Sequence, residues 1–231
     1  MLNDIISASV FLGVFITLGS YFIALKLREK TGLAVLNPLL VAVILTIAFL
    51  IATGTPYAVY NEGAKYVSYL LTPATVCLAI PLYEQLGALK RNYRAIAAGI
   101  VTGVLTSLLS VLALALVFGL GHREYVTFLP KSVTSAIGMG ISSELGGYTA
   151  ITVAVIILTG IIGNIIATPL CRLLKIKEPV AVGVAIGSAS HAIGTVRAME
   201  MGPVEGAMSS LSIALSGILT VFGAMIFQNF I

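Results

Sequence analysis

The long apolar stretches of this chain are the feature that most constrains its fold. Six of them, each close to the roughly 20 residues that a helix needs to cross a bilayer, lie at about 4–25, 33–53, 66–83, 95–118, 148–170 and 206–229. The chain is 58% hydrophobic and only 10% charged, whereas soluble domains carry about 25% charged residues. The sequence therefore predicts an all-α polytopic membrane protein, a single integral membrane domain over residues 1–231 with about six to eight membrane helices.

The basic residues predict how the chain is oriented. They gather in three short connections: Lys26, Arg28 and Lys30; Lys90, Arg91 and Arg94; Arg172, Lys175 and Lys177. Under the positive-inside rule these connections lie in the cytoplasm, which puts the N-terminus on the outer side of the membrane. The first apolar stretch has no charged n-region and is interpreted as a retained helix, not as a signal peptide. The net charge of +4 comes from such loops and gives no reason to expect nucleic-acid binding.

Two polar segments, 127–147 and 179–202, interrupt the apolar pattern. The basic connections at 84–94 and 171–178 are predicted on one side, so the chain between them crosses the membrane an even number of times. The two strong apolar stretches there supply both crossings, and 127–147 is then a re-entrant hairpin from the outer face. By the same reasoning 179–202 is a second hairpin, from the cytoplasmic face, and a broken helix that crosses fully is the alternative for each. This plan is transporter-like, although no internal sequence repeat is evident.

The first polar segment brings a lysine and several hydroxyls to membrane depth: Lys131, Ser132, Thr134 and Ser135. Pro130 suits a helix start, which would put the lysine in the first turn. The N-terminus of such a half-helix presents unpaired N–H groups and a partial positive charge. Together with Lys131 it predicts a carboxylate or phosphate site. The alternative is that Lys131 extends its ammonium group to the outer interface.

The second polar segment carries Ser188, Ser190, His191 and Thr195. His191 changes charge near physiological pH. It is therefore a candidate proton relay or donor to a substrate carboxylate, and the alternative is a satisfied structural donor. Arg197 and Glu200 are three residues apart, so on a helix they are expected to form an ion pair, with substrate binding by Arg197 as the second interpretation. Glu205 is interpreted as an interfacial cap or a coupling residue, and Glu144 as a further coupling candidate.

The apolar stretch 66–83 contains two prolines, Pro73 and Pro81. Proline removes a helical hydrogen bond and frees a carbonyl, so we expect an interrupted helix. Thr72 and Thr75 can bond the freed groups or a substrate.

Several kinds of chemistry are not indicated by the sequence. There is no Walker motif, no HExxH, no Cys/His cluster and no Gly-x-Ser-x-Gly. Cys77 and Cys171 lie far apart and predict neither a disulfide nor a metal site. We therefore expect no cofactor and no enzyme activity.

Four motifs in these segments resemble those of the LrgB/CidB family of bacterial membrane proteins, which includes YohK-like members and the plastid glycolate/glycerate transporter domain. They lie at Leu71–Tyr83, Leu129–Thr134, Ser190–Glu200 and Glu205–Leu211, and the resemblance covers essentially the whole chain. Thr72 stands where the family usually has glycine, and Ser135-Ala136 stands where Thr/Ala-Pro is usual.

The resemblance implies two functions from different classes. Some members are named antiholin-like regulators of murein hydrolase export and lysis, and others look like transporters of pyruvate, glycolate or glycerate. Bacterial members often act with a small LrgA/CidA-type membrane partner. Fold and family do not by themselves fix a function.

From the residues we favour a transporter or facilitator of small monocarboxylates, coupled to protons or sodium. Its predicted binding residues are Lys131, Ser132, Thr134, Ser135, Ser188, Ser190, His191, Thr195, Thr72 and Thr75. The antiholin-like regulator is the alternative. We also expect a homo-oligomer, a dimer in the simplest case, for which Gly103, Gly160 and Gly163 offer close-packing faces.

Overall fold

The computed structural model describes residues 11–32 and 36–231, and over these residues the chain forms helices and no strand. It divides into two compact units, residues 1–77 and 78–231. Within the described residues, five helical segments are long and apolar enough, by length and composition, to cross a membrane: Tyr57–Glu84, Leu86–Phe118, Thr149–Leu173, Pro179–Met201 and Pro203–Phe230. Pro38–Thr53 is a shorter apolar helix. The predicted all-α polytopic architecture is therefore confirmed.

The first unit contains α2 (Leu12–Thr31), α3 (Pro38–Thr53), α4 (Tyr57–Ser68) and α5 (Leu71–Cys77). Helix α2 packs against both α3 and α4, and Thr17 Oγ1 lies 2.8 Å from the Tyr60 hydroxyl. Asn37 caps α3 by accepting a hydrogen bond from the N–H of Leu39 at 2.9 Å, as expected where Asn precedes Pro at a helix start. The predicted stretches 4–25 and 33–53 begin within the ranges 1–10 and 33–35, which lie outside the described residues.

The helical run from Tyr57 to Glu84 is broken twice, after Ser68 and at Leu78. Each break lies a few residues before a proline, Pro73 in α5 and Pro81 in α6 (Ala79–Glu84). A proline at position i cannot donate to the carbonyl at i−4, so the regular hydrogen-bond ladder stops there. This is the interruption that the two prolines predicted.

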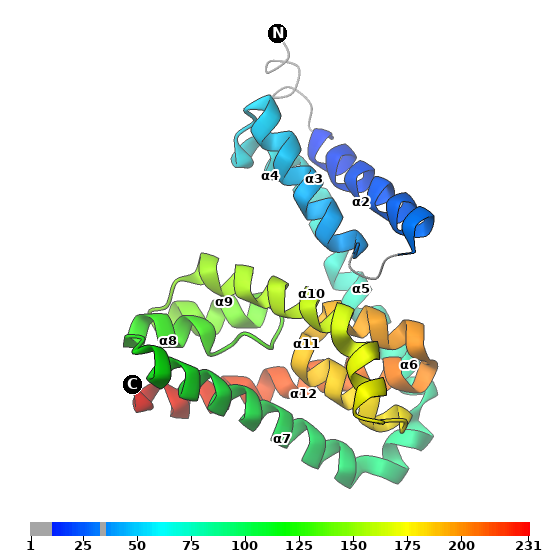
Figure 1. Ribbon diagram of the computed structural model, residues 1–231, viewed down its shortest axis with the longest axis vertical. Coiled ribbons are helices and arrows are strands. Elements are labelled where there is room, and N and C mark those ends of the chain that lie inside the picture. The colour runs from blue at the N-terminus through cyan, green and yellow to red at the C-terminus, as the bar shows by residue number, and fades with distance from the viewer. Residues whose placement is uncertain (1–10, 33–35) are drawn as a thin grey trace. The chain divides into compact units, whose positions relative to one another are not determined.

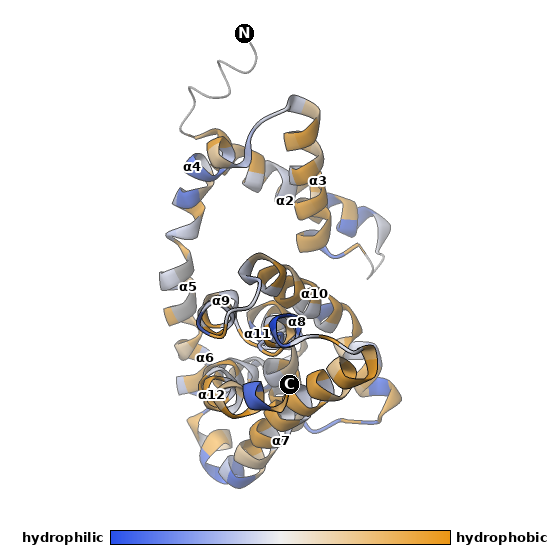
Figure 2. Cartoon of the chain, turned by 90° about the vertical axis from the view of Figure 1, so that its left-hand side faces the viewer, coloured by the Kyte–Doolittle hydropathy of each residue, from blue (hydrophilic) through white to orange (hydrophobic). Residues whose placement is uncertain are grey.

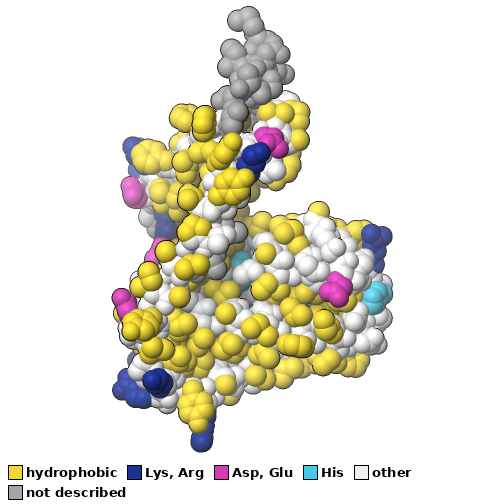
Figure 3. All heavy atoms as spheres, turned by 180° about the vertical axis from the view of Figure 1, so that it is seen from behind, with side chains coloured by type: hydrophobic (Ala, Val, Ile, Leu, Met, Phe, Trp, Pro, Cys, Tyr) yellow, Lys and Arg dark blue, Asp and Glu magenta, His cyan; other side chains and the backbone are white. Residues whose placement is uncertain are grey.

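The second unit contains α6, α7 (Leu86–Phe118), α8 (His122–Phe128), α9 (Ser135–Glu144), α10 (Thr149–Leu173), α11 (Pro179–Met201), α12 (Pro203–Phe227) and the 3₁₀ turn η1 (Gln228–Phe230). Helices α7 and α10 are hydrophobic along most of their length (Figure 2). On the face in Figure 3, Lys and Arg gather toward the ends of this unit and hydrophobic side chains cover much of the surface between them. This distribution suits a membrane-embedded body.

Helices α8 and α9 form a hairpin, called hairpin 1 (residues 122–144). The N–H of Lys131 donates to the carbonyl of Phe128 at 3.1 Å, and the N–H of Val133 donates to that of Pro130 at 3.3 Å. Thr134 is extended (φ −68°, ψ 152°) and α9 begins only at Ser135. The expected helix start at Pro130 is therefore wrong, because Pro130 and Lys131 belong to the reversing turn.

Neither arm of hairpin 1 is long enough to cross a bilayer. Helices α8 and α9 have 7 and 10 residues, which at 1.5 Å per residue is about 10 and 15 Å, against a hydrocarbon core of about 30 Å. The open end of the hairpin is fastened to α10. There the Thr152 hydroxyl lies 2.8 Å from Ser142 Oγ and 2.9 Å from the carbonyl of Thr127.

Helix α11 is broken at His191 (φ 42°, ψ −144°) and folds back, and we call it hairpin 2 (Figure 1). A Cβ added at Gly194 would lie 3.1 Å from Cγ2 of Ile186, although eight residues of straight helix span about 12 Å. Val182 and Ala198 share one buried apolar cluster. The second arm therefore returns along the first, which is the hairpin interpretation and not the broken helix that crosses.

The two hairpins enter the second unit from opposite ends. Helix α7 runs parallel to the first arm of hairpin 2, since Gly99 faces Val184 and Gly103 faces Ser188. Helix α10 runs antiparallel to that arm: it begins at the open end of hairpin 1, near Thr127, and ends where hairpin 2 begins. Helix–hairpin units of opposite direction are the inverted plan of many secondary transporters.

The two hairpins are related by an internal sequence repeat, which hydropathy alone does not indicate. Ser132–Gly146 reads SVTSAIGMGISSELG and Ser188–Gly202 reads SASHAIGTVRAMEMG. A shift of 56 residues aligns them, with identical residues at six positions: Ser132/Ser188, Ala136/Ala192, Ile137/Ile193, Gly138/Gly194, Glu144/Glu200 and Gly146/Gly202. The repeat is weak in the sequence because the arms that precede these segments differ.

The same shift matches the preceding helices α7 and α10. The buried residues of α7 are Ile96, Ile100, Val104, Leu108, Val111 and Ala115. At the same shift α10 buries Thr152, Ile156, Gly160, Ala167 and Cys171. Only the position of Leu108 has no buried counterpart, because Asn164 there is half-buried. The second unit is therefore an inverted repeat, α7 with hairpin 1 and α10 with hairpin 2, closed by α12.

Hairpin 2 packs so closely on α12 that glycine is required at the contact. A Cβ added at Gly187 would overlap the backbone of Ser209, whereas a Cβ at Gly140 of α9 meets nothing within 4 Å. Gly103, Gly160 and Gly163 likewise face Ser188, His191 and Ser190 of hairpin 2. The proposed use of these three glycines as faces for dimerisation is therefore wrong.

We predict that Gly187→Ala lowers the melting temperature of the purified protein by several degrees, whereas Gly140→Ala leaves it unchanged or raises it. Overpacking costs about 1–3 kcal/mol, and alanine at an open helical position is favoured over glycine by about 0.5–1 kcal/mol. Thermal unfolding in detergent measures both. Equal melting temperatures for the two variants would contradict the close packing of α11 on α12.

Candidate functional site

A polar cleft lies in the second unit where the turn of hairpin 1 meets α7 and the first arm of hairpin 2. Its volume is about 400 Å³. Its polar lining consists of Thr102, Thr106, Ser107, Ser110, Lys131, Ser132 and Ser188. The predicted site residues Lys131, Ser132 and Ser188, from both polar segments, are thus brought to one cavity.

Lys131 provides the positive charge of the cleft. Its side chain is half-buried, and Nζ donates to Ser132 Oγ at 3.0 Å. Ser132 Oγ in turn lies 3.1 Å from Ser107 Oγ on α7. Over residues 11–32 and 36–231, no carboxylate forms an ion pair with Lys131. A partly desolvated ammonium group that meets only hydroxyls favours the entry of a small anion.

An apolar groove of about 230 Å³ adjoins the cleft. The two cavities share Gly99 and Ala185, and the groove continues between α7 and hairpin 2 to Asn92 and Glu178. These last two residues lie near the start of α7 and immediately before α11. The groove and the cleft therefore lie next to each other along α7 and hairpin 2, and Lys131 lines the cleft.

Thr134 and Ser135 are placed at the start of α9 and do not line the cleft. Thr134 is the N-cap residue, and its side chain makes no capping hydrogen bond. Ser135 is the first helical residue. The half-helix N-terminus and the lysine are therefore separate features, because the turn carries Lys131 away from the start of α9.

His191, Ser190 and Thr195 pack against α10 and α12. The His191 Nε2 lies 2.9 Å from the carbonyl oxygen of Ile156, and because a carbonyl only accepts, Nε2 carries the proton. The Thr195 hydroxyl lies 2.9 Å from the carbonyl of His191 and 2.7 Å from Ser209 Oγ. These contacts give His191 and Thr195 each a structural partner near the tip of hairpin 2.

Four hydroxyls of the cleft, Thr102, Thr106, Ser107 and Ser110, had not been predicted. They had been hidden because the stretch 95–118 was interpreted as a uniform apolar span. The signal that could have found them is their spacing, four, five and eight residues after Thr102, which places them on one face of a helix.

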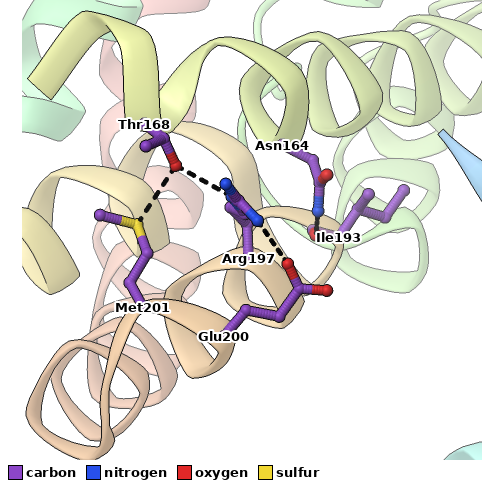
Figure 4. Close-up of polar contacts among 6 residues, drawn as sticks. All are labelled: Asn164, Thr168, Ile193, Arg197, Glu200 and Met201. Atoms are coloured by element: carbon purple, nitrogen blue, oxygen red, sulfur yellow. Dashed lines mark hydrogen bonds and ion pairs between the residues drawn. The ribbon is translucent and has the colours of Figure 1, made fainter. Parts of the chain in front are cut away.

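Arg197 and Glu200 belong to a different cavity, of about 350 Å³, near the open end of hairpin 2. Arg197 Nη1 lies 2.5 Å from Glu200 Oε2, and Nε donates to Thr168 Oγ1 at 2.9 Å (Figure 4). This is the pairing that the three-residue spacing had predicted. The hydrogen bond from Arg197 to Thr168 joins the second arm of hairpin 2 to α10.

Glu144 and Glu205 do not line the cleft. Glu144 is exposed at the end of α9, and Glu205 is half-buried in the first turn of α12. Thr72 and Thr75 lie in α5 of the first unit, and their role stays a prediction. Within the described residues no group of three His, Cys, Asp or Glu is placed to hold a metal ion.

These features define a class of protein: a multi-pass, all-α membrane protein in which an inverted pair of helical hairpins meets at a polar cleft. The chain belongs to the LrgB-like family, which matches residues 17–230. The resemblance in the four motifs is thereby confirmed.

The chain is similar to two holin-like proteins named CidB. It is 36% identical to the one from Staphylococcus epidermidis over 207 residues, 90% of each chain. It is also 36% identical to the one from Staphylococcus aureus over 219 residues, 95% of each chain. No solved structure matches the chain.

We predict that the cleft admits water and small polar reagents. In a chain with Cys77 and Cys171 changed to alanine, Ser107→Cys should react rapidly with a charged methanethiosulfonate reagent in intact membranes. Ser216→Cys should react at least about tenfold more slowly, because Ser216 is 2% exposed within the core. Gel-shift labelling measures both rates, and an unreactive Ser107→Cys would show that the cleft is closed to water.

Proposed function

We propose that this protein carries small monocarboxylates, of the pyruvate, glycolate and glycerate class, across a bacterial inner membrane. The observation that supports this most is Lys131, half-buried at the turn of hairpin 1 and hydrogen-bonded to Ser132. A carboxylate would neutralise the positive charge of Lys131 and accept charge-assisted hydrogen bonds, which are about twice as strong as neutral ones. Ser107, Ser132 and Ser188 would then bind the rest of the molecule.

The arrangement of the hairpins supports transport over static binding. The cleft is lined by the turn of hairpin 1 and by the first arm of hairpin 2, which enter the unit from opposite ends. Movement of either hairpin would open the same site to a different side of the membrane, as alternating access requires. Coupling to protons or sodium is part of this proposal, with Glu144, His191 and Glu205 as the candidate residues.

A second candidate function is a holin-like role, acting on murein hydrolase activity and cell lysis. The names of the CidB relatives favour this candidate more directly than they favour transport. It would involve a small LrgA/CidA-type membrane partner. We also propose that this chain forms a homodimer. The polar cleft with its half-buried lysine favours transport, because a pore that breaches the membrane needs no such site.

We predict that Lys131→Met lowers the uptake of labelled pyruvate and glycolate into proteoliposomes by about 10-fold to 100-fold. Loss of a hydrogen bond to a charged group costs about 1.5–3 kcal/mol, and 1.4 kcal/mol is a factor of ten. Lys90→Met, at an exposed position near the start of α7, is the matched control and should transport normally. Equal uptake by the two variants would overturn the site.

The two candidate functions differ in what crosses the membrane. A carrier gives saturable uptake that other short carboxylates compete, and it retains a large fluorescent dye inside the vesicle. A holin-like pore releases the dye, with or without the partner, and is insensitive to Lys131→Met. Dye release that accompanies uptake and does not saturate would favour the holin-like function.

A further inference from the structure

One face of helix α7 presents hydroxyl groups to the cleft, and these groups have no role in the proposed binding of the carboxylate. Thr102, Thr106 and Ser110 line the cavity opposite the turn that carries Lys131. All three are exposed on the surface of the second unit. They occupy the middle of a 33-residue helix that is otherwise apolar enough to cross a membrane, where polar groups are disfavoured unless they meet a partner or water.

The internal repeat provides a comparison within the same chain. At the shift of 56 residues, Thr102, Thr106 and Ser110 correspond to Leu158, Ile162 and Ile166 of α10. Those three apolar side chains are 52%, 54% and 43% exposed, so the matched face of α10 is exposed as well. The fold therefore does not require hydroxyls at this position of the repeat, and their presence on α7 alone points to the cleft.

The hydrogen bonds of the hydroxyl face decide what it can offer a ligand. Thr102 Oγ1 donates to the carbonyl of Ala98 at 2.8 Å, and Ser110 Oγ donates to that of Thr106 at 2.6 Å. Their protons are used within α7, so each oxygen presents lone pairs to the cleft. Thr106 has no side-chain hydrogen bond to any residue in the described part of the chain. An unbonded hydroxyl can donate as well as accept. Thr102 and Ser110 are therefore the acceptors of this face, whereas Lys131 is a donor.

We infer that Thr102, Thr106 and Ser110 form a second wall of the ligand site, which accepts a hydrogen bond from a hydroxyl of the bound anion. This inference rests on the proposed function for the carboxylate at Lys131. A 2-hydroxy acid carries both groups, a carboxylate for Lys131 and a hydroxyl donor for α7. A 2-oxo acid of the same size offers α7 only a carbonyl acceptor, which gains less from lone pairs. The face therefore discriminates lactate from pyruvate.

The test compares lactate with pyruvate on one protein. Purified chain is titrated with each acid and its thermal stabilisation is followed, and labelled pyruvate uptake is competed by each acid in proteoliposomes. We expect tighter binding of lactate by the unaltered chain. Thr102→Val, which removes a hydroxyl whose proton is already bonded to Ala98, should weaken lactate about 2-fold to 12-fold, the equivalent of one neutral hydrogen bond, and change pyruvate less than twofold. Thr159→Val, on α10 and outside the cleft, removes a hydroxyl as the control.

The outcomes separate this inference from the proposed function. Lactate binding that depends on Thr102, without uptake, supports the site and overturns transport. Uptake whose lactate preference is unchanged by Thr102→Val and by the Thr102→Val, Thr106→Val double variant overturns the hydroxyl wall alone. The absence of both binding and uptake overturns both. A variant that fails to fold is recognised by its melting temperature, and Thr102→Ser, which keeps the hydroxyl, should then restore the preference.

Discussion

The second unit depends on the requirement that every backbone polar group in an apolar environment has a hydrogen-bond partner. Both hairpins break a helix inside such an environment, and each break frees carbonyls and N–H groups. At hairpin 1 the turn satisfies its own groups through Phe128 and Pro130. At hairpin 2 the carbonyl of His191 is bonded by Thr195, which is bonded to Ser209 of α12. Some polar side chains near the tips therefore bond the backbone groups that the breaks free, and others line the cleft.

This division explains why residues of similar chemistry have different places. His191 bonds the backbone of α10, where Gly160 leaves room for its ring. Thr195 bonds the carbonyl of His191 and Ser209 of α12. Lys131 and Ser132 lie at the turn of the other hairpin and line the cavity. The repeat shows what the halves share and where they differ: Ser132 and Ser188 are matched and line the same cleft, whereas Gly187 stands at the position that matches Lys131. The inverted repeat thus supplies one binding site from two halves that are chemically unlike.

The family and the site support the function at different levels. Membership of the LrgB-like family and similarity to holin-like CidB proteins establish the kind of membrane protein. The cleft, its lysine and the adjoining groove between α7 and hairpin 2 are what favour a carrier of small anions. Fold alone does not decide between a carrier and a holin-like protein. Whether uptake depends on Lys131 separates these two functions.

The sequence by itself determined the all-α membrane class, the family and the two interrupted segments, because hydropathy, proline and charge act locally along the chain. It also indicated Lys131, Ser132 and Ser188 as site residues. Only the tertiary structure decided that α9 starts after the turn, that α11 folds back at His191, and that the hydroxyls of α7 face the cleft. These depend on which helices pack together, and a helix's apolar content does not say which of its faces meets a neighbour.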